Sequence, residues 1–236
     1  MISIITGTLN RGTLLPKLIE NTVEANDKLE LVLVDGGSTD GSIEYIKEEN
    51  HPRIKLIEVG GRSSYSHFMN LAIQNATHEI VCQWNDDVLL ANDWEEVFSE
   101  IDEENDFYLF NWKYGMPNDI QNQEWLFGND HSNDWYLLNT KPDGHIVMNY
   151  GLYKKKIFRE IGMYNSEYRY YAADSDMAER AYYFGYKVKD LRSIKVCSLI
   201  VDKVAQHFSD DFEIFNKNIS LYKNKILPTT VEILKN

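Results

Sequence analysis

Residues 29–41 read LELVLVDGGSTDG, and this stretch decides the class of fold. Leu29–Asp35 is almost entirely apolar, which is typical of a strand that is covered on both faces of a parallel sheet. The glycines and small polar residues that follow Asp35 favour a turn rich in helix-capping residues. This turn leads into a helix expected over Ile43–Glu49, so the stretch predicts one strand–turn–helix unit of an α/β fold.

The same alternation runs through the first half of the chain. Periodic apolar residues predict further strands and helices, namely strands at Ile2–Thr6, Ile54–Val59 and Glu79–Trp84, and helices from Leu14 to Val23, over Tyr65–Ala76 and from about Asp93 to Ile101. Helical segments of this length between strands imply right-handed crossovers. The expected fold is a mostly parallel central sheet flanked by helices.

The second half is less regular. Residues 113–144 show no clear periodicity, so we expect a functional loop or short elements there. Regular patterns return in a series of segments: His145–Tyr150, an amphipathic Lys154–Ile161, a helix Asp174–Phe184, strands near Tyr186–Leu191 and Ile194–Val201, and a tail 210–236 with a helix and a break at Pro228.

Length and charge limit the function. The chain has 236 residues, which suits one large domain or two tightly fused halves. Lysine and arginine number 24 against 37 acidic residues, a net charge of −13. Such a field repels polyanions, so we do not expect nucleic acid or anionic membrane surfaces as partners. A small phosphate ligand stays compatible with the charge if cations are supplied locally.

Cysteine usage and hydropathy predict the compartment. Cys82 and Cys197 lie inside apolar runs, and two cysteines are too few for a disulfide scaffold or a zinc-ligand set. The opening residues MISIITGTLN carry no basic segment of a signal peptide. No apolar run approaches the roughly 20 residues that cross a bilayer. We therefore expect a cytoplasmic protein without a transmembrane segment.

Polar residues follow each expected strand of the first half. In open α/β sheets, ligands bind beyond the carboxyl ends of the strands. The stretches at these positions are Thr6–Arg11, Asp35–Ser38, Gly60–Ser63 and Asn85–Asp87. Asp35 can accept hydrogen bonds from a ribose hydroxyl or a base N–H, or it can stabilise its turn. Glycine-rich dinucleotide and P-loop motifs are absent from the sequence.

Acidic residues mark two further candidate positions. Asn85, Asp86 and Asp87 offer oxygen ligands for Mg²⁺ or Mn²⁺, which could bridge the acidic chain to a diphosphate; the alternative is an Asx turn before the next helix. Asp174, at a helix start, is either an N-cap or a site residue. Asp176 has Arg180 four residues on, which suggests a surface ion pair. His207 is either a ligand or a structural residue.

These residues together resemble the family 2 glycosyltransferases with the GT-A fold. The similarity covers roughly residues 1–190 in order. It is carried by the opening strand and helix, by LELVLVDGGSTDGSIEYI, by the segment from Gly61 through Asn70 to Asn85-Asp86-Asp87, and by Gly162-Met163-Tyr164 with the stretch from Ala173 to Tyr186.

The resemblance implies an inverting transfer of a sugar from a UDP, GDP or TDP sugar to a hydroxyl of a glycan or other acceptor. It assigns Asp174 as the catalytic base, with Asp87 and His207 as ligands of Mn²⁺ or Mg²⁺. Polysaccharide or glycoconjugate synthesis is the expected process. The residues that it places at the nucleotide sugar are Thr6, Thr8, Asn10, Arg11, Asp35, Gly36, Arg62, Asn70, Asn85 and Asp86.

The sequence departs from the family pattern at two positions. Asn85 stands where the Asp-x-Asp metal motif has its first acid, and in the other register Trp84 takes that place with Asp86 as the second acid. Ala173 stands where the family often has a glutamate before the base. We expect Asp87 to be the direct metal ligand, and Asp174 to act without an adjacent acid.

The expected organisation is a single GT-A domain over residues 1–236. Its nucleotide-sugar half ends at about residue 112, its acceptor half covers about 113–207, and 208–236 form a C-terminal tail. Two alternatives are a nucleotidyltransferase and a non-catalytic module that binds nucleotide sugars or glycans. The first needs a glycine-rich basic loop after the first strand, where Thr6–Arg11 offers only Gly7 and Arg11. The imperfect metal motif motivates the second.

Overall fold

The computed structural model describes residues 1–114, 146, 148–199 and 210–235. The expected loop over 113–144 lies almost wholly outside the described residues, and so does His207. Both cysteines are buried and free, as their apolar surroundings predict. None of the described helices is long and apolar enough to cross a membrane.

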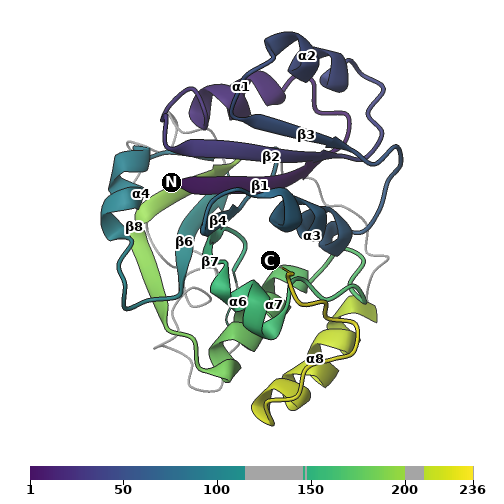
Figure 1. Cartoon of the computed structure of the whole chain (residues 1–236), viewed down its shortest axis with the longest axis vertical. Coiled ribbons are helices and arrows are strands. Elements are labelled where there is room, and N and C mark those ends of the chain that lie inside the picture. The colour runs from purple at the N-terminus through teal and green to yellow at the C-terminus, as the bar shows by residue number, and fades with distance from the viewer. Residues whose placement is uncertain (115–145, 147, 200–209, 236) are drawn as a thin grey trace.

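The first half forms a parallel block of four strands in the order β3-β2-β1-β4 (Figure 1). The bounds of its elements are β1 Ile2–Thr8, α1 Leu15–Asn21, β2 Leu29–Asp35, α2 Ser42–Glu49, β3 Ile54–Glu58, α3 Tyr65–Asn75 and β4 Ile80–Gln83. Thr8 of β1 pairs with Asp35 of β2, so the carboxyl ends of these strands lie level. The α/β prediction is confirmed here.

Side-chain alternation along β2 explains why helices cover both faces. Leu31 and Leu33 belong to the core with α1 and α2, whereas Val32 and Val34 belong to the core with α3. All four side chains are buried, as expected for a central strand of a parallel block. Figure 1 shows α1 and α2 on one side of β1–β3, and α3 on the other.

The second half extends the sheet with strands of both directions. Within the described residues, eight strands form one sheet in the order β3-β2-β1-β4-β7-β6-β8-β5, and four of the seven pairings are parallel. The added strands are β5 Val88–Leu90, β6 Phe107–Tyr114, β7 Gly151–Lys154 and β8 Val188–Ser198. The sheet is therefore mostly parallel, but its added part is mixed.

The sequence pattern does not predict β5, β6 and β7, and it predicts two strands where the structure has the single strand β8. β5 and β7 have only 3 and 4 residues, too few to show a period. In β8 the register jumps from Phe110↔Leu191 to Asn111↔Lys195, so residues 192–194 bulge out of the ladder. This bulge interrupts the apolar pattern and makes one strand look like two.

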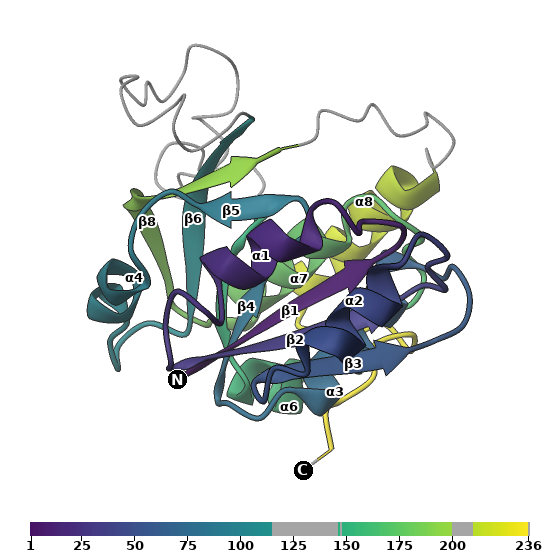
Figure 2. The same cartoon turned by 90° about the horizontal axis from the view of Figure 1, so that it is seen from above.

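Four helices complete the described part of the second half: α4 Trp94–Glu100, α6 Lys156–Ile161, α7 Ala173–Phe184 and α8 Asp210–Lys223. Side chains of α6, α7 and α8 share one buried core with α3. Viewed from above, α7 and α8 lie across the sheet from α1 and α2 (Figure 2).

The expected surface ion pair of Asp176 and Arg180 is wrong, because both side chains are fully buried between α7 and α8. Asp176 Oδ1 accepts hydrogen bonds from Tyr168 Oη at 2.8 Å and Tyr222 Oη at 2.7 Å. Sequence spacing gave the common helix face correctly, but that face turns toward α8 and not toward solvent.

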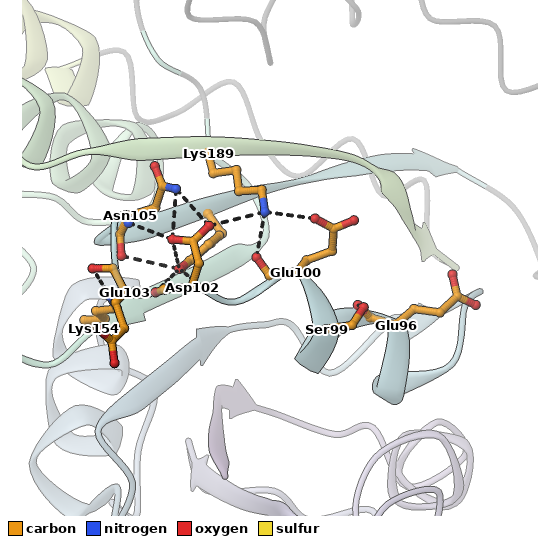
Figure 3. Close-up of polar contacts among 9 residues, drawn as sticks. Glu96, Ser99, Glu100, Asp102, Glu103, Asn105, Lys154 and Lys189 are labelled. Carbon is orange, nitrogen blue, oxygen red and sulfur yellow. Dashed lines mark hydrogen bonds and ion pairs between the residues drawn. The ribbon is translucent and has the colours of Figure 1, made fainter.

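An acidic turn at residues 100–105 is held against β7 and β8 (Figure 3). Lys189 Nζ lies 3.0 Å from Glu100 Oε2 and 3.4 Å from Asp102 Oδ2. Lys154 Nζ donates to the Asp102 carbonyl at 2.9 Å, and Asn105 N donates to Asp102 Oδ1 at 2.8 Å. Such exposed ion pairs contribute little stability each, so their main effect is to fix the end of α4.

Glu30 on β2 connects β1, β3 and the segment that leads into β4. Its carboxylate accepts hydrogen bonds from Ser3 Oγ at 2.6 Å and Thr77 N at 2.8 Å, and Lys55 Nζ lies 2.8 Å away. Burial opposes ionisation of Glu30, but Lys55, Ser3 and Thr77 outweigh it and lower its pKa to about 2.

We expect Glu30→Gln to lower the free energy of unfolding at pH 7 by about 2 kcal/mol, discounted for the exposure of Lys55. Since the pKa is lower in the folded chain, this contribution exists above the unfolded value of about 4.3 and is lost as pH falls toward about 2. Urea titrations between these pH values measure it. The control Glu58→Gln removes the exposed pair with Lys47 and should cost under about 0.5 kcal/mol. Equal losses in both variants would contradict the prediction.

Candidate active site

The loops that follow β1 and β2 are bound to each other. Gly36 N donates to the Thr8 carbonyl at 2.9 Å. Asn10 N donates to Ser38 Oγ at 2.9 Å, and Asn10 Oδ1 accepts from Thr39 N at 2.8 Å. Asn10 has a φ of 55°, a conformation that asparagine tolerates better than most residues. The predicted nucleotide residues Thr8, Asn10 and Gly36 therefore form one rigid edge.

Asp35 uses its carboxylate to shape its own turn. Its Oδ2 accepts from Gly37 N at 2.6 Å and Ser38 N at 2.9 Å, and its Oδ1 accepts from Ser38 Oγ at 2.5 Å. Only 1% of Asp35 is exposed. A Cβ on Gly36 would lie 3.1 Å from Phe68, so a larger residue fits poorly there. The turn-stabilising alternative is thus observed, and a nucleotide contact stays a prediction.

Asn85, Asp86 and Asp87 form the turn between β4 and β5. Trp84 precedes them with its indole fully buried, and its Nε1 donates to the Val88 carbonyl at 3.0 Å, which closes the turn. Leu199 N donates to the Asp87 carbonyl at 2.8 Å, which ties the turn to the end of β8. Trp84 therefore belongs to the core, and the partly buried polar residues after it stand at the sheet edge.

Asp86 is an acid with a raised pKa. Burial raises the pKa of Asp86 to about 6, although the nearby Thr8 hydroxyl and Arg11 lower it. Arg11 Nε lies 3.6 Å from Asp86 Oδ1, which connects the loop after β1 to the turn after β4. The cost of ionising Asp86 here means that a further nearby cation would be favourable.

Asp174 occupies the first turn of α7. Burial raises the pKa of Asp174 to about 6, against a hydrogen bond of 2.8 Å from Ser175 N to its Oδ1. Burial and the neighbouring Asp174 charge raise the pKa values of Tyr65 and Tyr153. Ala172 just before the helix has a φ of 58°, which is costly for a residue other than glycine.

Asn149 contacts Asp174, and the sequence pattern does not predict this contact. In the amide orientation that matches donors with acceptors, Asn149 Nδ2 donates to Asp174 Oδ2 at 3.2 Å, and its Oδ1 accepts from Trp112 Nε1 at 2.8 Å. Gln83 Nε2 donates to the Asn149 carbonyl at 2.8 Å. No local sequence motif indicates a role for Asn149. Its position follows from strand pairing: Gly151 pairs antiparallel with Gln83, which brings the residues before β7 to the edge where β4 ends.

The remaining predicted residues occupy different positions. Thr6 is buried in β1, where its hydroxyl donates to the Gly7 carbonyl at 3.1 Å. Asn70 on α3 bonds both backbone groups of Tyr164 at 2.8 Å, so its amide connects α3 to the segment after α6. Arg62 lies exposed in the loop before α3. Nucleotide contacts by these three residues stay predictions.

The pKa of Tyr170 responds to charges from the Asn85–Asp87 turn and from two arginines. Burial and Tyr171 raise the pKa of Tyr170, and so does the charge of Asp87 nearby. Arg11 and Arg62 lower it. Arg62 and Tyr170 line the same cavity, and the charges of Asp87 and Arg11 are near enough to act on Tyr170. Asp174 follows Tyr170 by four positions in the sequence.

Comparison with known families agrees with this geometry. The sequence model described as glycosyl transferase family 2 matches residues 3–162, which is more than half of the chain. The chain belongs to this family. Among curated proteins, none matches the sequence significantly.

Solved structures share the fold of this family 2 chain at low sequence identity. The mannosyltransferase PcManGT from Pyrobaculum calidifontis, in complex with GDP-Man and Mn²⁺, has a TM-score of 0.64 at 20% identity, over 94% of this chain and 62% of that one. S. aureus TarS 1-349 in complex with UDP-GlcNAc gives 0.67 at 20% identity, over 94% and 66%. The chain therefore spans less than two thirds of the length of these structures.

In this family 2 chain, we expect Asn149→Leu to raise the pKa of Asp174 by about one unit above its value near 6, because the ionised carboxylate loses a donor. Carbon-13 NMR of labelled aspartate carboxyls measures it, with Asp174→Asn assigning the signal. Trp112→Phe keeps an aromatic ring but removes the Nε1 donor, which frees the Asn149 amide to rotate. This variant should raise the pKa of Asp174 by a smaller amount. An unchanged pKa in Asn149→Leu would show that the contact does not act on Asp174.

Proposed function

We propose that the chain is an inverting glycosyltransferase that moves a sugar from a nucleotide diphosphate sugar to an acceptor hydroxyl, in polysaccharide or glycoconjugate synthesis. The observation that carries the proposal is the pair of acids at one sheet edge. Asp86 in the turn after β4 and Asp174 at the start of α7 both have pKa values raised to about 6 by burial. Strongly perturbed carboxyls at the edge of a sheet where ligands bind are typical of active sites.

Asp174 is the proposed catalytic base. A carboxylate with a pKa near 6 is ionised at neutral pH, yet it is more basic than an exposed aspartate. It would accept the proton of the acceptor hydroxyl while that oxygen attacks the sugar from the face opposite the leaving diphosphate. Asn149 would hold the carboxylate in one orientation through the second oxygen.

The edge formed by β1 and β2 is the proposed nucleotide site, in the half that ends at about residue 112. Asp35 accepts one hydrogen bond at Oδ1 and two at Oδ2, which leaves Oδ1 able to accept one more from a ribose hydroxyl or a base N–H. Thr6, Thr8, Asn10 and Gly36 would lie beside it. Two structural neighbours bind GDP-Man and UDP-GlcNAc respectively, so the choice among UDP, GDP and TDP is left to experiment.

The turn Asn85–Asp87 suits a divalent cation. Asp86 and Asp87 are adjacent carboxylates, and burial makes the Asp86 charge costly without a further cation. The part of the chain that the structure describes contains no group of three metal-binding side chains, and the predicted ligand His207 lies outside it. We propose Asp87 and His207 as ligands of Mn²⁺ or Mg²⁺, which when bound neutralises charge on the departing diphosphate.

The function is tested by incubating the chain with UDP-, GDP- and TDP-sugars and Mn²⁺ and following nucleotide release. With the active donor, Asp174→Asn should lower turnover at least about 100-fold, because general-base catalysis contributes about 10²–10⁴-fold. The control Asp27→Asn changes an exposed acid and should leave turnover unchanged.

The pH profile gives an independent measure. Since the base must be ionised, turnover should be constant above about pH 7 and fall about tenfold per unit below the Asp174 pKa near 6. No release from any donor, with no change in Asp174→Asn, would overturn the enzyme proposal and leave a non-catalytic binding module.

Metal dependence is tested at the binding step. Titration calorimetry with the donor nucleotide should show affinity that falls at least about tenfold with a chelator and in Asp87→Ala, because the charge of the diphosphate is then uncompensated. The control Asp27→Ala should bind as the wild-type chain does. An affinity for the donor nucleotide that stays unchanged with the chelator and in Asp87→Ala would favour a metal-free donor site.

A further inference from the structure

A cavity of about 200 Å³ lies between the start of α3 and the loop before α7. Its lining consists of Arg62, Ser63, Ser64, Arg169 and Tyr170. Both arginines are exposed, and among the described residues neither guanidinium forms an ion pair. The lining thus combines two unneutralised cations with three hydroxyl groups, which is a donor-rich surface for an anion.

The charge of this cavity contrasts with the rest of the chain. The net charge of the chain is −13. Three other arginines, Arg11, Arg159 and Arg192, form ion pairs with acids. Arg53 and Arg180 donate to backbone carbonyls. Among the described residues, Arg62 and Arg169 are thus the two arginines whose guanidinium has neither a carboxylate nor a carbonyl partner. Arginine is suited to carboxylates and phosphates, because its planar guanidinium donates two parallel hydrogen bonds.

The wall that carries Arg169 and Tyr170 is held rigidly. Asp211 on α8 is only 1% exposed, and its carboxylate accepts from the backbone N–H groups of Arg169 at 3.1 Å, Tyr170 at 2.9 Å and Tyr171 at 2.8 Å. Tyr65 N donates to the Arg169 carbonyl at 3.0 Å, which fixes the wall to α3. A preorganised wall loses little conformational entropy when a ligand binds.

Aromatic rings extend this wall. Tyr170 is 41% exposed and contacts Tyr171 edge-on with ring centroids 5.0 Å apart. Tyr171 stacks with Phe212 at 5.9 Å, and Phe212 is 54% exposed. Exposed rings beside hydroxyls and arginines suit a ligand with both apolar faces and charged groups, as a sugar acid has, better than they suit a small inorganic ion.

We propose that this cavity is an acceptor subsite for a negatively charged sugar, either a sugar phosphate or a sugar carboxylate in a glycan. The inference rests on the proposed function. The loop leads through Ala172 directly to Asp174, so a sugar held by Arg62 and Arg169 would lie beside the base. A contact of Arg62 with the donor diphosphate is the competing assignment, and the experiment separates the two.

The test uses the full chain and three probes: glucose 6-phosphate, glucuronate and glucose, each titrated to about 50 mM while NMR follows the amides of residues 169–171. We expect both charged sugars to bind at least about tenfold more tightly than glucose, and to weaken with added salt. Arg169→Gln should lower their affinity at least about tenfold. The matched control Arg192→Gln removes an exposed guanidinium on β8 and should leave it unchanged.

Two further measurements make the outcome decisive. Arg169→Gln should leave the affinity for UDP with Mn²⁺ unchanged, whereas a loss of UDP affinity in this variant, with or without a loss of charged-sugar binding, would assign the cavity to the donor phosphates and overturn the proposal. Failure of glucose 6-phosphate and glucuronate to shift these amides would also overturn it. Preference for only one of the two charged sugars would support the subsite and identify its acid. Since these readouts need no turnover, they stay informative even if nucleotide release fails.

Discussion

The pairing of β4 with β7 connects the two parts of the candidate site. Gln83 lies opposite Gly151, where a Cβ would approach the Tyr108 carbonyl to 2.1 Å, so only glycine fits. Because the strands are antiparallel, the residues before β7 lie beside those after β4. The Gln83 amide then holds the Asn149 carbonyl, and Tyr164 Oη donates to Gln83 Oε1. Asp174 thereby lies at the same edge as Asn85–Asp87, with Asn149 between the two parts of the chain.

Acidic residues serve different purposes in different surroundings. Glu30 is stabilised in its charged form by donors on neighbouring strands, and its pKa falls to about 2. At Asp86 and Asp174 the nearby donors and charges do not outweigh burial, and their pKa values rise to about 6. Folding thus favours the ionised form of Glu30 but opposes that of the two site acids. A cation near Asp86 or Asp174, or a proton bound to either carboxylate, reduces this cost of burying a negative charge.

The sequence predicts the parallel block well and the mixed part poorly. Leu29–Asp35 contains the apolar run Leu31–Val34, which is typical of a doubly covered strand, and its bounds agree with β2. Val88–Leu90 and Gly151–Lys154 are too short to show a period, and they exist because neighbouring strands bind them. Asp174 and Asn85–Asp87 follow recognisable patterns. Asn149 could not be found in this way, because its position depends on a long-range strand pairing.

Asp211 connects the C-terminal helix α8 to the loop before the proposed base, Asp174. The family match ends at residue 162, before α7 and α8 begin. Substitutions along α8 can therefore move the loop of Arg169 and Tyr170 while the edge formed by β1 and β2 keeps its geometry. The two proposed substrate sites thus depend on different supports, one on the sheet and the other on the C-terminal helix, so a substitution can alter one site and leave the other in place.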